Sequence, residues 1–365
     1  LFQQLADNHP GLLSEAAYDN LAWAEREGVI TGTLGFPAFR ALMIEKFGRD
    51  EEDEERETYP HISWDAYLAQ LPADESEAED AVAVVFVEGG IRTGDIGPGV
   101  AGSHDVAQLI RRAYENEDTR ALVVRVNSPG GSVIASDIIR DELLAAQARD
   151  LPVVVSMGDV AASGGVWLSS PADRIFAESA TITGSIGVAV AFPTLENVFD
   201  YVGVNFDGVT TSEHAGWGPH LGMNEKLDAI FARWAGSAYQ RFIGVVASGR
   251  DKEPDYIRSI AGGRVWLAEA AQERGLVDDI GSIDQALEAA AEMAGLEAYR
   301  VDYVTPQPSR AAQLLQRFAI GALGVDGDLR EHSFARRLAR LMEELEGIRE
   351  PRATVLCAHC MIDLP

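Results

Sequence analysis

Through the middle of the chain, short apolar runs alternate with segments that have the spacing of amphipathic helices. The runs at 82–87, 121–126 and 152–156 are almost continuously apolar, which is typical of strands buried on both faces. A helix is expected at 132–149, and further elements are expected at 106–115, 174–177, 195–201 and 223–247. Strands that alternate with helices favour a parallel sheet. The sequence therefore predicts an α/β domain, which we place at residues 81–305.

The first of two glycine-rich loops joins a buried strand to a helix. It runs from Asn127 to Ser132 with the sequence NSPGGS. Paired glycines let the backbone turn sharply and present N–H groups at a helix N-terminus, where negative charge is favoured. Such a loop suits an oxyanion hole, although a tight turn with an N-cap is an equally open interpretation of this loop alone.

The second loop follows the next buried strand and surrounds one hydroxyl with small residues. It runs from Met157 to Trp167 with the sequence MGDVAASGGVW. A nucleophilic serine needs close backbone approach and an N–H just after it, and Ser163 with Gly164 supplies both. A glycine-rich N-cap is the alternative, and only the pairing with the first loop favours catalysis. A third segment, TITGSIGV at Thr181–Val188, suits either this site or a solvated turn.

The group that would activate Ser163 is not evident in this chain. A Ser-His-Asp triad needs a histidine, yet His214 and His220 occupy a glycine-rich stretch that favours a surface position. A Ser-Lys dyad needs a lysine buried enough to be neutral. Three of the 30 basic residues are lysines, and all three have the charged neighbours of solvated side chains: Lys46, Lys226 and Lys252. The sequence thus predicts a nucleophile without a base of its own.

Composition excludes several functions. The formal net charge is −28, which would repel nucleic acid and anionic membrane surfaces, and it indicates either salt adaptation or ordinary solubility. The chain has no apolar run of about 18 residues, so we expect no membrane span within it. Cys357, His359 and Cys360 lie near the end, and they suit a redox pair, half a metal site, a local disulfide or an ordinary tail. We predict no metal and no cofactor.

An internal sequence similarity suggests a second copy of the domain. Residues Trp23–Gly48 and Ala271–Gly295 both contain a Glu-Arg step, a Gly followed by two apolar residues, a second Gly, and an amphipathic stretch that ends in Gly. We therefore expect residues 1–70 to be the C-terminal remnant of a preceding repeat plus an acidic linker, although chance similarity between Ala/Glu-rich helices is the alternative. Residues 306–365 are expected to form a helical extension and tail.

Four segments together resemble signal peptide peptidase A, of the long duplicated type found in Gram-negative bacteria. They are the three segments above and VWLAEAAQERGLVDDIG at Val265–Gly281. The resemblance implies a crotonase-like/Clp-protease-like ββα superhelix and a Ser-Lys dyad. It implies that Ser163 is the nucleophile, that Gly130 and Gly164 donate the oxyanion-hole N–H groups, and that Ser185 hydrogen-bonds the lysine.

The resemblance also implies where the lysine lies. Short family members carry a Lys-Ser step where this chain reads Thr211-Ser212-Glu213-His214-Ala215, whereas in the long form the N-terminal repeat supplies the lysine. We therefore expect this chain to be the C-terminal half of such a protein. The resemblance further implies that remnant signal peptides are cleaved by a homotetramer anchored in the inner membrane, on its periplasmic face. A small apolar substrate pocket is expected from Val133, Ile134 and Ile186.

Three other functions fit parts of the pattern. A crotonase-type acyl-CoA enzyme would use the same paired loops to hold a thioester enolate, but it would not need a serine at position 163. A non-catalytic half would be inactive without a partner chain. A Ser-His-Asp peptidase would depend on His214 or His220.

Overall fold

The computed structural model describes residues 20–306, apart from 52–56, 69, 71–75, 77, 96–98, 192–193, 210–217 and 219. The chain divides into two compact units, Leu1–Glu77 and Ala78–Pro365. The predicted helical extension and the two cysteines fall in residues 307–365, outside the described part of the chain. None of the described helices is both long enough and apolar enough to span a lipid bilayer.

The described part of the first unit contains three short helices: α3 (Asn20–Arg26), α4 (Phe36–Phe47) and α5 (Trp64–Leu68). Pro37 lies in the first turn of α4, where its missing N–H costs nothing. No residue of α4 is buried, and Phe36, Phe47 and Trp64 are each more than 60 % exposed. This unit therefore has little apolar core among its described residues.

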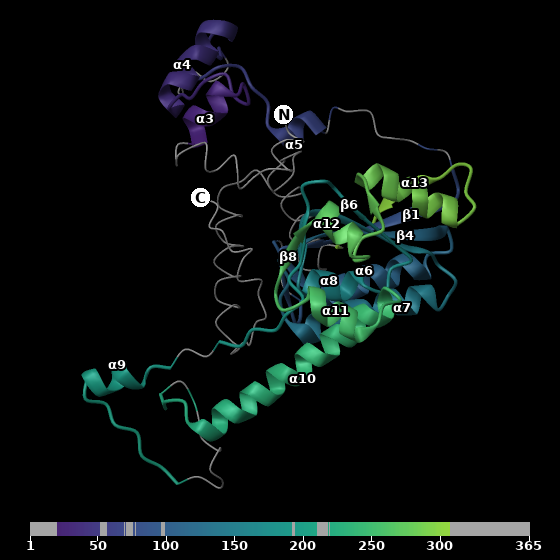
Figure 1. Cartoon of the computed structure of the whole chain (residues 1–365). Coiled ribbons are helices and arrows are strands. Elements are labelled where there is room, and N and C mark those ends of the chain that lie inside the picture. Colours follow the sequence, from purple (N-terminus) through teal and green to yellow (C-terminus); the bar gives the residue numbers. More distant parts are fainter. Residues whose placement is uncertain are drawn as a thin grey trace, which may run out of the picture. The chain divides into compact units, whose positions relative to one another are not determined.

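The second unit is built on a sheet whose main path is entirely parallel (Figure 1). Its strands run in the order β10-β1-β4-β5-β6-β9. Their bounds are Arg300–Tyr303 (β10), Ala81–Glu88 (β1), Thr119–Ser128 (β4), Val153–Ala162 (β5), Arg174–Ala177 (β6) and Asp279–Ile280 (β9). Strand β7 (Ile182–Gly184) pairs with β5, β8 (Val265–Leu267) pairs antiparallel with β7, and β2 (Gly90–Arg92) pairs with β3 (Val100–Gly102). The predicted α/β class is confirmed.

Helices cover both faces of this sheet. Helices α6 (Ser103–Glu115), α7 (Val133–Gln147) and α8 (Gly164–Ser169) pack on one face, and α13 (Ile283–Met293) packs on the other (Figure 1). Successive strand residues alternate between the two cores: Leu122 and Val124 join the first, and Val123 joins the second. This explains why the strands are continuously apolar in sequence. The remaining helices are α9 (Glu196–Tyr201), α10 (Glu225–Gly249), α11 (Pro254–Ile260) and α12 (Ala268–Glu273).

The sheet brings the two glycine-rich loops to one edge. Strands β4 and β5 are parallel neighbours, so their carboxyl ends point the same way. The Asn127–Ser132 loop follows β4, and Ser163 follows β5 directly. In open α/β sheets, the carboxyl ends of the strands are where ligands bind. Segments more than 30 residues apart in sequence therefore meet in space.

Candidate active site

Ser163 has an unusual backbone conformation at the junction between β5 and α8. Its φ is +51° and its ψ is −112°, a region that residues with a side chain rarely occupy and that persists only where the surroundings enforce it. The Ser163 N–H donates to the Gly184 carbonyl at 2.9 Å, and its carbonyl accepts from Trp167 N–H at 3.0 Å. The residue is 2 % exposed, and no hydrogen bond engages its hydroxyl within the described structure.

The first loop packs directly against this serine because it contains glycine. Gly130 has a φ of +104°, and a Cβ on it would lie 2.7 Å from the Ser163 Cβ and 2.8 Å from the Gly164 nitrogen. A Cβ on Gly164 would in turn lie 2.4 Å from the Ser136 hydroxyl and 3.2 Å from the Gly131 nitrogen. Only hydrogen at both positions allows the two loops to approach this closely. The pairing of loops expected from sequence is therefore present.

The backbone N–H groups of Gly130, Gly131 and Gly164 differ in whether they donate a hydrogen bond. The Gly130 N–H donates to the Ser128 hydroxyl at 3.1 Å, in a buried position. The Gly131 and Gly164 N–H groups have no acceptor within the described residues. This argues against Gly130 as an oxyanion donor and favours Gly131, its neighbour. The resemblance implies Gly130 for this role; the residue types do not show which N–H is available, because the direction of each N–H depends on the backbone angles of the loop.

The third segment is buried rather than solvated. Thr181 and Thr183 are 1 % and 0 % exposed, and Ser185 is 7 % exposed. Ser185 has a φ of +52° and donates its N–H to the Arg264 carbonyl at 2.7 Å. Because Ala162 pairs with Gly184 in the β5–β7 ladder, Ser163 and Ser185 follow equivalent positions on neighbouring strands. The solvated-turn interpretation of this segment is thus wrong.

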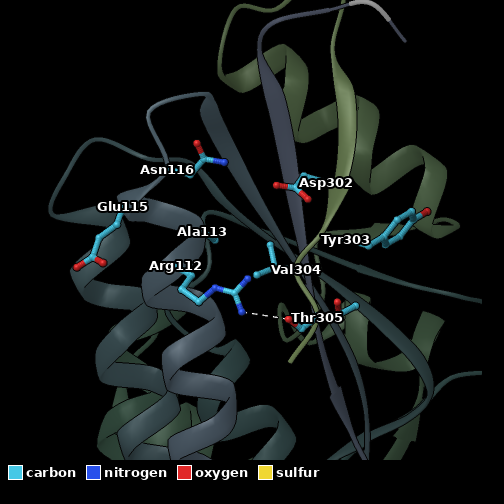
Figure 2. Close-up of a pocket in the computed structure, with 8 residues that line it drawn as sticks. All are labelled: Arg112, Ala113, Glu115, Asn116, Asp302, Tyr303, Val304 and Thr305. Atoms are coloured by element: carbon cyan, nitrogen blue, oxygen red, sulfur yellow. Dashed lines mark hydrogen bonds between the residues drawn. The ribbon is translucent and has the colours of Figure 1, made fainter. Parts of the chain in front are cut away.

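The three predicted pocket residues differ in exposure. Ile134 is 66 % exposed, and Val133 is partly buried against the core. Ile186 is 1 % exposed and belongs to that core, so it offers a ligand almost no side-chain surface. Two cavities lined by described residues lie away from these three side chains. One of about 380 Å³ is next to the end of α6, where Arg112 donates to the Thr305 carbonyl at 3.1 Å (Figure 2).

Neither a lysine nor a histidine is positioned as a base among the described residues. Lys46, Lys226 and Lys252 are all exposed, which confirms the solvated positions expected for them. His220 packs on the Phe206 ring with centroids 4.5 Å apart, and His214 lies outside the described residues. Burial raises the pKa of the Tyr114 and Tyr299 phenols, but neither residue belongs to the loops around Ser163.

Comparison with known proteins gives this geometry a context. Residues 145–297 match the model of peptidase family S49. Protease 4 of Salmonella typhi is 42 % identical over 251 residues, which are 69 % of this chain and 40 % of that protein. A putative protease of Synechocystis is 34 % identical over 207 residues, which are 54 % of this chain and 72 % of that protein.

A solved chain of a ClpP1 mutant from Listeria monocytogenes covers 56 % of this chain and 94 % of its own length, with 16 % identity and a TM-score of 0.39. This likeness is too distant to carry an argument. The chain spans less than half the length of the Salmonella relative. The Synechocystis relative, in contrast, is matched over most of its length. On that relative and on the family model together, the chain belongs to peptidase family S49.

Proposed function

We propose that Ser163 is the nucleophile of a serine endopeptidase and that this chain carries the serine half of its active site. The observation that carries the proposal is the strained backbone of Ser163, whose hydroxyl, like the Gly131 and Gly164 N–H groups of the two packed loops, has no hydrogen-bond partner among the described residues. Enzymes that form an acyl intermediate need this combination of nucleophile and oxyanion donors. Membership in peptidase family S49 supports the same reaction.

The chemistry proceeds in two steps. The Ser163 hydroxyl oxygen attacks a peptide carbonyl carbon, its proton passes to a neutral amine, and the resulting oxyanion is held by the Gly131 and Gly164 N–H groups. The carbon–nitrogen bond then breaks, the leaving amine takes that proton, and an acyl-serine ester remains. Water hydrolyses the ester and restores the serine. The Gly130 N–H already donates to the Ser128 hydroxyl. Gly130 therefore contributes only by allowing the two loops to approach each other.

We propose that the neutral amine is a lysine from a preceding repeat. All three lysines of this chain are exposed, whereas a lysine that acts as a base has to be buried. Ser185, which the β5–β7 pairing places beside Ser163, would hydrogen-bond that lysine. The Ser-Lys dyad is thus completed by a residue outside this sequence.

Matching helix ends support the duplication. After α3, Gly28 donates to the Glu25 carbonyl and Val29 to the Ala24 carbonyl; after α12, Gly275 donates to Gln272 and Leu276 to Ala271. Both glycines have a left-handed φ, of +70° and +69°. This pair of bonds is the Schellman motif, and it occurs at the two positions that the internal sequence similarity aligns. A second glycine with positive φ ends the helical stretch in each copy, at Gly48 and Gly295.

The proposed substrate is an extended apolar peptide, such as the remnant of a signal peptide. The exposed Ile134 and the half-buried Val133 begin the helix that follows the first loop, so they would contact side chains next to the cleaved bond. Ile186 supports that surface only from beneath, because it is buried. Signal peptides are released in the membrane, which accords with an enzyme held at the periplasmic face of the inner membrane.

We also propose self-association through an apolar arm, defined as the described residues 195–209, 218 and 220–234. Its exposed large apolar side chains are Leu195, Val198, Tyr201, Val202, Val204, Phe206, Val209, Leu221, Met223, Ile230 and Trp234. An exposed apolar surface of this extent is typical of an interface. Helix α10 buries mainly its last residues, with Leu227 as the exception in its first turns. A homotetramer would cover this arm.

A fluorophosphonate probe tests the nucleophile, since it labels an activated serine covalently. In the full-length protein, we expect Ser163→Ala to abolish labelling. Ser169→Ala is the matched control, because Ser169 is another fully buried serine, six residues further on, whose hydroxyl only donates to the Gly165 carbonyl. Labelling that persists in Ser163→Ala, or its absence from the full-length protein, would refute the proposal. The second result would favour an acyl-CoA enzyme or a non-catalytic half.

A further inference from the structure

Strand β5 changes its partner just before it reaches Ser163. Residues Val154–Met157 pair with β6, whereas Val160–Ala162 pair with β7. The register against β4 slips between these two parts, because Val126 pairs with Met157 while Ser128 pairs with Ala161. The last three residues of β5 are therefore held chiefly by β7, which is only three residues long. Short ladders of this kind hold a strand end weakly, because few bonds fix its position.

One side chain fastens these two short segments to each other. The Thr183 hydroxyl donates to the Ala161 carbonyl at 2.7 Å, and Thr183 is fully buried. Ala161 lies two residues before Ser163, and Thr183 lies two residues before Ser185. The Ser163 N–H also donates to Gly184, the residue between Thr183 and Ser185. The hydroxyl thus joins the two strands directly behind both serines.

Both serines need such support. Ser163 and Ser185 have positive φ angles, +51° and +52°, and such conformations persist only where the surroundings hold them. A buried hydrogen bond from a β-branched side chain is rigid, since threonine has few χ1 rotamers. Water cannot replace it at a fully buried position. A methyl group in place of the hydroxyl would leave the Ala161 carbonyl without this donor.

We propose that Thr183 is a positioning residue that sets the separation and orientation of Ser163 and Ser185. The proposal rests on the function proposed above, in which Ser163 gives its proton to a lysine that Ser185 hydrogen-bonds. Misplacement of a reacting group by about 1 Å costs about 10²-fold in rate. Loss of the Thr183 hydroxyl would act on the chemical step, because neither Thr183 nor Ala161 has a surface that substrate can reach.

Three variants of the full-length protein separate positioning from folding. Thr183→Val removes the hydroxyl and keeps the shape, and Thr183→Ser restores a hydroxyl. Thr181→Val is the matched control: the Thr181 hydroxyl is also buried and also donates at 2.7 Å to a β5 carbonyl, but at Gly158, five residues before Ser163. Thermal unfolding verifies that the two valine variants lose comparable stability.

The readout is the rate of fluorophosphonate labelling as a function of probe concentration. We expect Thr183→Val to lower the maximal rate about 10- to 100-fold at an unchanged half-saturating concentration. Thr183→Ser and Thr181→Val are expected to stay within about 3-fold of wild type. Equal maximal rates for Thr183→Val and Thr181→Val, when both are folded, would overturn the proposal.

Hydrogen exchange over residues 158–168 gives a second readout that does not depend on the reactivity of Ser163. Thr183→Val should speed exchange of the Ser163 amide, which donates to Gly184, whereas Thr181→Val should not. If wild type is unlabelled, the proposed peptidase function fails, and this exchange comparison still decides whether Thr183 holds the strand end. Unchanged exchange in Thr183→Val overturns the positioning role.

Discussion

The contact between Gly130 and Ser163 can be tested by adding a single methyl group. In Gly130→Ala the new Cβ would lie 2.7 Å from the Ser163 Cβ, 2.8 Å from the Gly164 nitrogen and 3.0 Å from the Ala162 carbonyl oxygen. Two of these atoms are backbone, so no side-chain rotation relieves the crowding. Carbon atoms pack at about 3.5–4.0 Å, so the two loops would have to separate by about 1 Å.

Gly94→Ala is the matched control. Gly94 has a φ of +105°, almost equal to the +104° of Gly130, but a Cβ there meets nothing within 4 Å. Both variants lose about 1–2 kcal/mol of unfolding free energy because alanine is strained in a left-handed conformation. Only Gly130→Ala loses a further amount, of about 1–3 kcal/mol, through overpacking. We therefore expect losses in the free energy of unfolding of about 1–2 kcal/mol for Gly94→Ala and about 2–5 kcal/mol for Gly130→Ala.

Two measurements on the full-length protein check this reasoning. Urea denaturation gives the two stability losses, and fluorophosphonate labelling of the folded fraction gives the reactivity of Ser163. A shift of about 1 Å should slow labelling about 10²-fold in Gly130→Ala and leave Gly94→Ala near wild type. Equal stability losses for the two variants, or wild-type labelling of Gly130→Ala, would show that the loops do not meet as described.

Two further predictions concern surfaces away from Ser163. Trp234→Gln should lower the molar mass seen by light scattering if the apolar arm joins copies of the chain, whereas Met293→Gln, equally exposed on α13, should not; the same mass for both would exclude the arm as the interface. Stability should fall as the pH rises above about 10, because burial and a hydrogen bond to Glu142 raise the pKa of Tyr114 in the folded state. Below that pH the Tyr114 phenol is neutral in both the folded and the unfolded state, and its stabilising contribution to folding is fully present. Tyr114→Phe should flatten the alkaline part of a denaturation-versus-pH curve, and an unchanged curve would contradict this assignment.

The long elements of the second unit were predictable from the sequence. The runs at 82–87 and 121–126 became β1 and β4 because continuous apolar residues can be buried only between two helical layers. The run at 174–177 became β6 with the same bounds. Ser163 could be singled out because small residues and a following Gly-Gly pair permit close backbone approach. The exposure of the three lysines followed from their charged neighbours.

The tertiary structure alone decided the finer features of the site. Strands β2, β3, β7 and β8 have three residues each, too few for a periodic pattern, so the segment at Thr181–Val188 was compatible with a solvated turn. Which of two adjacent glycines has an N–H without an acceptor in the described structure depends on loop dihedral angles that no residue type specifies. The bond from Thr183 to Ala161 joins residues 22 positions apart. Local sequence determines which residues can form strands and tight turns, whereas the pairing of distant segments determines which of their polar groups remain available for chemistry.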